Sequence, residues 1–210
     1  MGDTIANNDF LSIRISPLHL HADELIFRSY ITAFSDNFKS SWKSENVYGR
    51  MDPIAIYSNT QRSINLGFRV ISTSEEEAVQ NTNKISQLLR WLYPSYQPAG
   101  GAAPAILKAP PFFEIYCANI MRSINNGAGL QGYIDGITIN PGIGTDKAQV
   151  IAAGGTSIYF PDVEINFNFT VLHDHNVGWY GDTFANNENG GMYPYGVGPS
   201  QTVEEGITPA

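Results

Sequence analysis

The chain has 210 residues, of which 42% are hydrophobic and 15% are charged, and its formal net charge is −8 at pH 7. These are values of a globular chain that can bury a substantial core as one domain, with or without extensions. The acidic balance argues against nucleic acid as the main partner, because phosphate binding needs concentrated Lys and Arg.

The N-terminal part of the chain is predicted to hold an arm and two strands. Residues 1–9 are polar and are predicted to form the arm. Apolar and polar residues alternate from Leu11 to Ile15, which predicts a first strand that Pro17 ends. The run Asp23–Phe34 is rich in aromatic and β-branched residues, which favours a second strand.

The segment Ser35–Asn59 is polar and turn-rich, yet it carries several large aromatic residues. These are Phe38, Trp42, Tyr48 and Tyr57. Large aromatic side chains in a segment without hydrophobic periodicity indicate contact with another surface. We therefore predict a long loop or hairpin over residues 35–59 that packs against another protein surface.

A strand followed directly by one long helix is the strongest pattern in the chain. Ile64, Leu66, Phe68 and Val70 alternate with less apolar residues, which predicts the strand. Ser72 and Ser74 each precede a glutamate by three residues, which is typical of a helix start. The helix is predicted over residues 75–92, with an apolar stripe of Ala78, Val79, Ile85, Leu88, Leu89 and Leu92 and an end before Pro94.

Two further strands are predicted after a connector rich in Pro, Gly and Ala. Phe112–Ala118 is predicted to be buried on both faces. It contains Cys117, the single cysteine, which excludes an internal disulfide and predicts a buried structural thiol. The strand Leu130–Ile139 contains Gly132 and Gly136, which permit a bulge or a close backbone approach.

The clearest strand is Val163–Val171, in which five apolar residues face one way and polar residues face the other. From Gly181 to Ala210 periodicity is lost, which predicts an extended or disordered C-terminal arm. The predicted fold class is therefore α+β: a mostly antiparallel β-barrel or sandwich over residues 10–180, flanked by one amphipathic helix.

Four histidines are the only candidates for a metal site, as His19 with His21 and His173 with His175. Alternate residues of a strand point to the same face, so each pair could present two imidazoles to one ion. We favour the alternative, hydrogen-bonding histidines at strand ends, because no Cys or suitably spaced carboxylate completes a metal motif. No phosphate-binding loop, nucleophile elbow or paired acids are found, so we expect neither an enzyme nor a cofactor. No apolar segment approaches 18 residues, so we expect no membrane contact.

Several blocks of the sequence resemble virion structural proteins of tailed bacteriophages, of the tail-tube and baseplate type. The blocks are Phe27–Val70, Arg90–Tyr96, Leu107–Met121, Leu130–Ile143 and Val163–Trp179. Within them, Gly49–Pro53, Leu92–Pro94 and His173–His175 carry the most characteristic motifs. The resemblance covers most of residues 10–180.

The resemblance implies a tube-like β domain that assembles into homo-oligomeric rings with other tail and baseplate proteins. It also implies location in the virion, in the tail or baseplate, after assembly in the host cytoplasm. The long segment would then reach an adjacent subunit, with Trp42, Tyr48, Arg50 and Tyr57 as interface candidates. Two alternatives remain: a peripheral baseplate adaptor, or a receptor- or carbohydrate-binding β-module. In the latter, sugar rings would stack on exposed aromatic side chains, with Trp42, Trp179, Tyr180 and Tyr195 as candidates.

Overall fold

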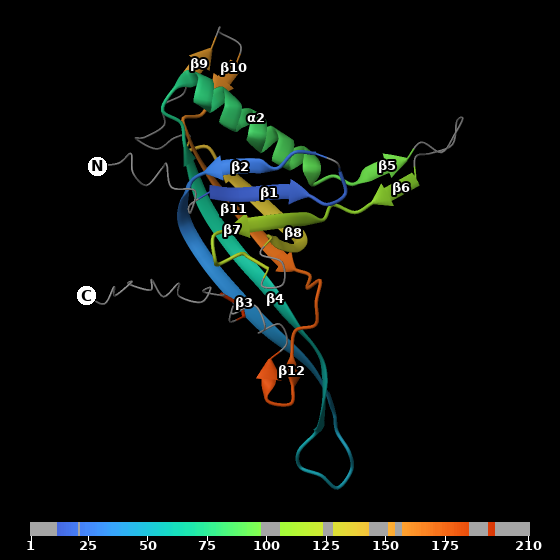
Figure 1. Cartoon of the computed structure of the whole chain (residues 1–210). Helices are drawn as coiled ribbons and strands as arrows, with labels where there is room; N and C mark the ends of the chain where they lie inside the picture. The colour runs from blue at the N-terminus through green and yellow to red at the C-terminus, as the bar shows by residue number, and fades with distance from the viewer. Residues whose placement is uncertain are drawn as a thin grey trace, which may run out of the picture.

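One antiparallel sheet of seven strands forms the body of the protein (Figure 1). The computed structural model describes residues 12–20, 22–97, 106–123, 128–142, 151–153, 157–184 and 193–195. In spatial order the strands are β2 (Leu25–Arg28), β1 (Ser12–Pro17), β7 (Phe113–Cys117), β8 (Leu130–Asn140), β11 (Asp162–Val171), β4 (Ile54–Ile71) and β3 (Tyr30–Glu45). Within the described residues, one helix, α2 (Glu75–Trp91), packs against the sheet. The predicted α+β class is confirmed.

Three small two-stranded sheets complete the secondary structure of the described residues. They are β5 (Ser95–Gln97) with β6 (Ile106–Ala109), β9 (Ile151–Ala153) with β10 (Ser157–Tyr159), and β12 (Trp179–Tyr180) with β13 (Thr183–Phe184). The predicted N-terminal arm, residues 1–9, lies outside the described residues. Of the predicted C-terminal arm, only residues 181–184 and 193–195 are described.

The sheet coils strongly, so that its two edge strands come together at one corner. β2 and β3 lie at opposite edges of the sheet, yet only Ser29 separates them in the chain. The ring of Phe27 in β2 lies 5.7 Å from the ring of Phe68 in β4, although four strands stand between β2 and β4 in the sheet. The described strands thus form an open, barrel-like sheet that wraps around its own inner face, and not a closed barrel.

The core lies on that inner face. Val163, Ile165, Phe167 and Phe169 of β11 stand opposite Val70, Phe68, Leu66 and Ile64 of β4, and all eight side chains are buried. Burial of each contributes about 1.5–3 kcal/mol before the entropy cost of ordering. The apolar faces of these two strands therefore share one interior.

Helix α2 begins as predicted and packs on the same core. The side chain of Ser74 accepts a hydrogen bond from the amide of Glu77 at 3.2 Å, and the Glu77 carboxylate accepts one from the amide of Thr73 at 2.8 Å. Ser72, the other candidate cap, instead accepts from buried Asn81 Nδ2 at 3.0 Å. The buried apolar residues are Ala78, Ile85, Leu88 and Trp91. Val79, Leu89 and Leu92 lie at the edge of this stripe and are half-buried.

Two predicted strands need correction. The run Asp23–Phe34 is not one strand, because the chain leaves the sheet at Ser29 and passes from one sheet edge to the other. β7 is fully buried on one face only, because only the side chains on the inner face of the coiled sheet lie in the core. The long loop over residues 35–59 is a hairpin whose strands extend to Glu45 and resume at Ile54.

The two glycines of β8 have the structural roles that the sequence suggests. A Cβ at position 132 would lie 2.0 Å from the carbonyl oxygen of Thr170, so only glycine fits between these backbones. Next to Gly136, the pairing of β8 with β11 shifts by one residue at Asp135. This bulge increases the local bend of the sheet.

Candidate functional site

The outer half of the β3–β4 hairpin projects from the body as a two-stranded ribbon (residues 37–62; Figure 1). This ribbon is called the arm from here on and is distinct from the predicted N-terminal and C-terminal arms. β3 and β4 pair out to Glu45 and Ile54, whereas β11 accompanies β4 only from Ser63 to Ile71. From Arg62 outward to the tip, therefore, β3 and β4 pair only with each other within the described residues.

The inner face of the arm continues the core face of the sheet. Moving outward, the paired residues on this face are Phe34 and Leu66, Asp36 and Ile64, Phe38 and Arg62, Ser40 and Thr60, and Trp42 and Tyr57. A bulge at Ser58 keeps Tyr57 on the same face as Thr60, whose Oγ1 lies 2.7 Å from the Tyr57 hydroxyl oxygen. The rings of Trp42 and Tyr57 meet edge to face at 5.2 Å. Along one face, the row thus begins with an apolar pair, continues through charged and hydroxyl side chains and ends with an aromatic pair.

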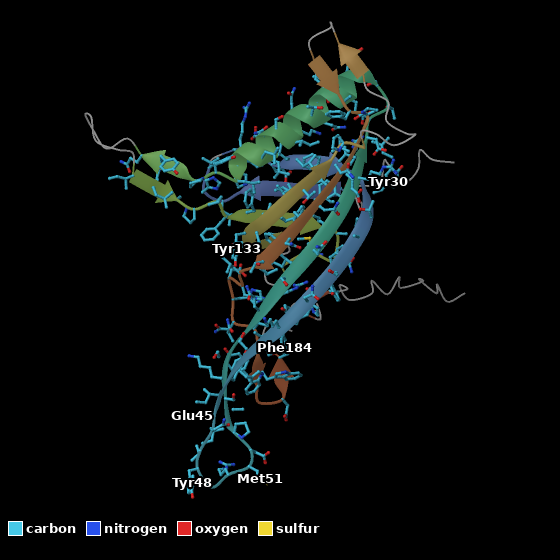
Figure 2. All side chains as sticks on the ribbon, turned by 180° about the vertical axis from the view of Figure 1, so that it is seen from behind. Tyr30, Glu45, Tyr48, Met51, Tyr133 and Phe184 are labelled. Carbon is cyan, nitrogen blue, oxygen red and sulfur yellow. The ribbon has the colours of Figure 1, made fainter. Side chains whose placement is uncertain are left out.

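The aromatic end of this row is open to solvent. Trp42 is 61% exposed and Tyr57 is 51% exposed, while Tyr48 and Met51 at the tip are fully exposed. Figure 2 shows Tyr48 and Met51 at the far end of the arm, away from the body. Exposed apolar side chains gathered on one element form a candidate interaction surface.

The four predicted interface residues all lie on the arm. Trp42 and Tyr57 form the aromatic pair described above. Tyr48 and Arg50 lie in the tip turn, where the Arg50 amide donates to the carbonyl of Val47 at 3.2 Å and Gly49 has a φ of 87°. The structure therefore brings these residues onto one projecting element, and their role as an interface stays a prediction.

A buried ion pair anchors the base of the arm. Arg62 and Asp36 have side chains that are only 1% and 2% exposed. Arg62 Nε donates to both Asp36 carboxylate oxygens, at 3.1 and 3.0 Å, and Nη2 donates to Oδ2 at 2.7 Å. This bidentate geometry satisfies both charges away from water.

Three aromatic rings surround the guanidinium of Arg62. Its Cζ lies 5.3 Å from the ring centre of Phe38, 5.7 Å from that of Tyr193 and 5.9 Å from that of Tyr195. The Tyr195 hydroxyl donates to Asp36 Oδ2 at 3.0 Å. Burial raises the pKa of both tyrosines, and for Tyr195 the bond to Asp36 raises the pKa further. A segment far along the chain is thereby tied to the arm.

A cavity of about 490 Å³ lies between the inner face of the arm and the chain that follows β11. From the arm it is lined by Phe38, Tyr57, Thr60 and Arg62. From the following chain it is lined by His173, His175, Asn176, Val177, Gly178, Phe184 and Tyr193. The cavity therefore combines four aromatic rings with two imidazoles and one paired guanidinium.

The three histidines of the described residues contact neighbouring side chains. His173 Nε2 lies 3.0 Å from the Tyr193 hydroxyl, His175 Nδ1 lies 2.6 Å from Asp174, and the two rings are 6.1 Å apart. Burial lowers the pKa of His173, and neighbouring His175 and Arg62 lower it further. His19 packs edge-on against Phe113, and His21 lies outside the described residues. Across the described ranges, no three His, Cys, Asp or Glu residues are grouped as metal ligands.

Cys117 is buried on the inner face of β7, which confirms the prediction of a structural thiol. Burial raises the pKa of this thiol to about 11. The thiol is therefore protonated at neutral pH, and a protonated, inaccessible sulfur is a poor nucleophile.

Comparison with known proteins finds distant likeness to solved structures alone. No family model and no curated protein matches the chain. A solved structure titled "Tail of empty GTA particle computed with helical refinement, C6 symmetry" contains a chain with 9% identity and a TM-score of 0.35. The alignment covers 80% of this chain and 94% of that one. Similarity at this level carries no argument about function.

Of the described helical residues, no stretch is long and apolar enough to cross a bilayer.

Proposed function

We propose that this chain is a structural subunit of a bacteriophage-type tail, which assembles with its own copies into a ring that forms or initiates the tail tube at the baseplate. The sequence blocks that resemble tail-tube and baseplate proteins motivate the proposal. The coiled antiparallel sheet with one helix agrees with it. The role is structural and requires no catalytic group or cofactor, and it would locate the protein in the virion.

The arm is the observation that carries the proposal. A two-stranded ribbon alone is at best marginally stable in water, and this one carries Trp42, Tyr48, Met51 and Tyr57 exposed along its length and tip. Aromatic residues of this kind dominate the binding energy of protein interfaces when a partner covers them. An arm built in this way is suited to reach a neighbouring subunit.

The sheet edges offer a second means of association. Within the described residues, β2 and β3 each have a strand neighbour on one side only. Unpaired edge amides and carbonyls favour pairing with a strand of another chain. In a ring, pairing between neighbouring sheets would satisfy both edges.

The test is assembly of the full chain with and without the arm aromatics. Size-exclusion chromatography with light scattering, followed by negative-stain microscopy, would follow wild type and a Trp42→Ala/Tyr48→Ala variant over a range of concentrations. We expect wild type to form rings and the variant to remain monomeric with only a small decrease in its unfolding midpoint, because both side chains are largely exposed and only the contact between Trp42 and Tyr57 is lost. Tyr96→Ala is the matched control, since Tyr96 is 60% exposed but lies in the β5–β6 hairpin.

Two results would contradict the proposal. One is a wild-type protein that stays a monomer at high concentration and binds no other tail protein. The other is a double variant that assembles as well as wild type. A particle reconstruction that shows the chain outside the tube would favour the peripheral adaptor instead.

A carbohydrate-binding module is the second candidate, favoured by the 71% exposure of Trp179. Tyr180 and Trp42 are also exposed, whereas Tyr195 is bonded to Asp36 and is less available for stacking on a sugar. A glycan-array signal that Trp179→Ala abolishes would support this function. An array without signal at high protein concentration would remove it.

A further inference from the structure

The segment Tyr193–Tyr195 is held on the base of the arm through its side chains. The Tyr195 hydroxyl donates to Asp36, and both tyrosine rings lie over the Arg62 guanidinium. The Tyr193 ring also contacts Phe38 edge to face at 6.2 Å, and its hydroxyl lies 3.0 Å from His173 Nε2. Charge-assisted hydrogen bonds and cation–π contacts of this kind recognise particular side chains.

The receiving surface is built by the arm strands themselves. The site consists of Asp36, Phe38 and Arg62 and is here called the tyrosine socket. Phe38 of β3 is paired with Arg62 of β4, and Asp36 lies two residues before Phe38 on the same face. Arg62 is already fixed by its bidentate bonds to Asp36, so the rings of the segment are not needed to neutralise it. The socket therefore has its shape and charge before the segment arrives, as a preorganised binding site does.

The segment is not packed tightly on all sides. The cavity of about 490 Å³ borders Tyr193 and opens between it, Phe38 and Tyr57. Tyr193 is half-buried, and Tyr195 is 38% exposed. Contacts that leave such space next to them can be broken without opening the sheet core.

We propose that the tyrosine socket is a binding site for a chain segment in which one residue separates two tyrosines, and that Tyr193–Tyr195 is a separable ligand which fills it within the same chain. Tethering gives such a ligand a local concentration on the order of millimolar, so the socket is filled in the isolated chain. Without its own tyrosines, the socket accepts the same segment from solution. This property is independent of the proposed role in a tail.

The test uses the full chain with Tyr193→Ala/Tyr195→Ala and a fluorescent peptide of residues 190–199. Fluorescence anisotropy is measured at protein concentrations below any self-association. We expect saturable one-to-one binding to the variant and at least tenfold weaker binding to wild type, whose socket is occupied. A peptide with phenylalanine in place of Tyr195 should bind about tenfold more weakly, because it cannot donate to the Asp36 carboxylate.

The controls separate a lost site from a lost fold. Far-UV circular dichroism must match wild type for the double variant. If that variant does not fold, the full-chain variant Tyr195→Phe keeps both rings and should still bind the added peptide more strongly than wild type does. The proposal is overturned by a folded variant that does not bind the peptide, by equal binding to wild type, or by equal affinity for the Tyr195→Phe peptide.

Discussion

The two halves of β4 form the same kind of strand for different reasons. The inner half, Ser63–Ile71, lies between β3 and β11 and buries Ile64, Leu66, Phe68 and Val70. The outer half, Ile54–Arg62, pairs only with β3 and carries polar and aromatic residues that remain largely exposed as far as Gln61. Burial of apolar surface holds the first half, whereas cross-strand contacts and one ion pair hold the second.

The two halves of β4 should differ in local stability. Cross-strand pairs such as Ser40 with Thr60, at 3.1 Å between hydroxyl oxygens, contribute roughly 0.2–1 kcal/mol each. A register slip in the inner half would turn its apolar residues to solvent, but the outer half has no such constraint. The arm should therefore open at lower free energy than the body does.

Phe68→Ala is expected to have the largest effect. Its ring is fully buried between Phe27 and Phe167, so its removal should lower the free energy of unfolding by about 3–5 kcal/mol. Urea denaturation followed by circular dichroism measures this loss. Tyr57→Ala, in the outer half, should cost less than about 1 kcal/mol. Equal losses in the two variants would remove the distinction between body and arm.

Asp36→Ala tests the ion pair at the boundary of the two halves. The substitution leaves the Arg62 guanidinium buried without its carboxylate, which should cost about 3–5 kcal/mol. The double variant Asp36→Ala/Arg62→Met removes both charges and should recover most of that loss, because a buried pair is often replaceable by apolar groups. A double variant as unstable as the single one would show that the charge itself is not the cause.

The parts of the fold that follow from local pattern were predictable. Val163–Val171 and Ile64–Val70 alternate strictly because one face of each lies in the core. The start of α2 was readable because Ser74 caps free amides within three residues. Trp91 is buried three residues after Leu88 but is absent from the predicted stripe, because that stripe continues to Leu92, which is the C-cap of the helix.

The parts that depend on distant contacts were not predictable. The run Asp23–Phe34 has uniform strand propensity, and only the closure of the sheet decides that it breaks at Ser29. Asp36 and Arg62 are 26 residues apart, and Tyr195 is 159 residues from Asp36. No period or motif connects positions at such separations, so the tyrosine socket left no signal in the sequence. The aromatic content of residues 35–59 did indicate the exposed arm.

Ser74→Ala should have a smaller effect that is confined to the body. Loss of the side-chain acceptor for the Glu77 amide should lower the free energy of unfolding by about 1 kcal/mol. Ser86→Ala, in the helix interior, is the matched control, and alanine there should be neutral or slightly stabilising. Hydrogen exchange should show faster exchange in α2 and no change in the arm. A change in the arm of equal size would mean that body and arm do not open independently.

The smallest expected effect is a pH dependence of the contact between His173 and Tyr193. Burial lowers the pKa of His173, and His175 and Arg62 lower it further, against an opposing effect of Asp174. As the pH falls, the opened state therefore takes up a proton before the packed state does. The contact should be fully formed above the ordinary histidine pKa of about 6.5 and should weaken as pH falls below it.

Trp179 can report this opening, because its ring contacts Phe184 at 5.3 Å and Phe184 stacks on Tyr193 at 5.6 Å. Its fluorescence should change in that pH range in wild type and in His175→Gln, and should stay constant in His173→Gln. A Trp179→Phe variant gives the background from the other two tryptophans. If His173→Gln keeps the wild-type transition, protonation of another group controls the opening. In that case the contact with His173 does not help to hold Tyr193 at the tyrosine socket.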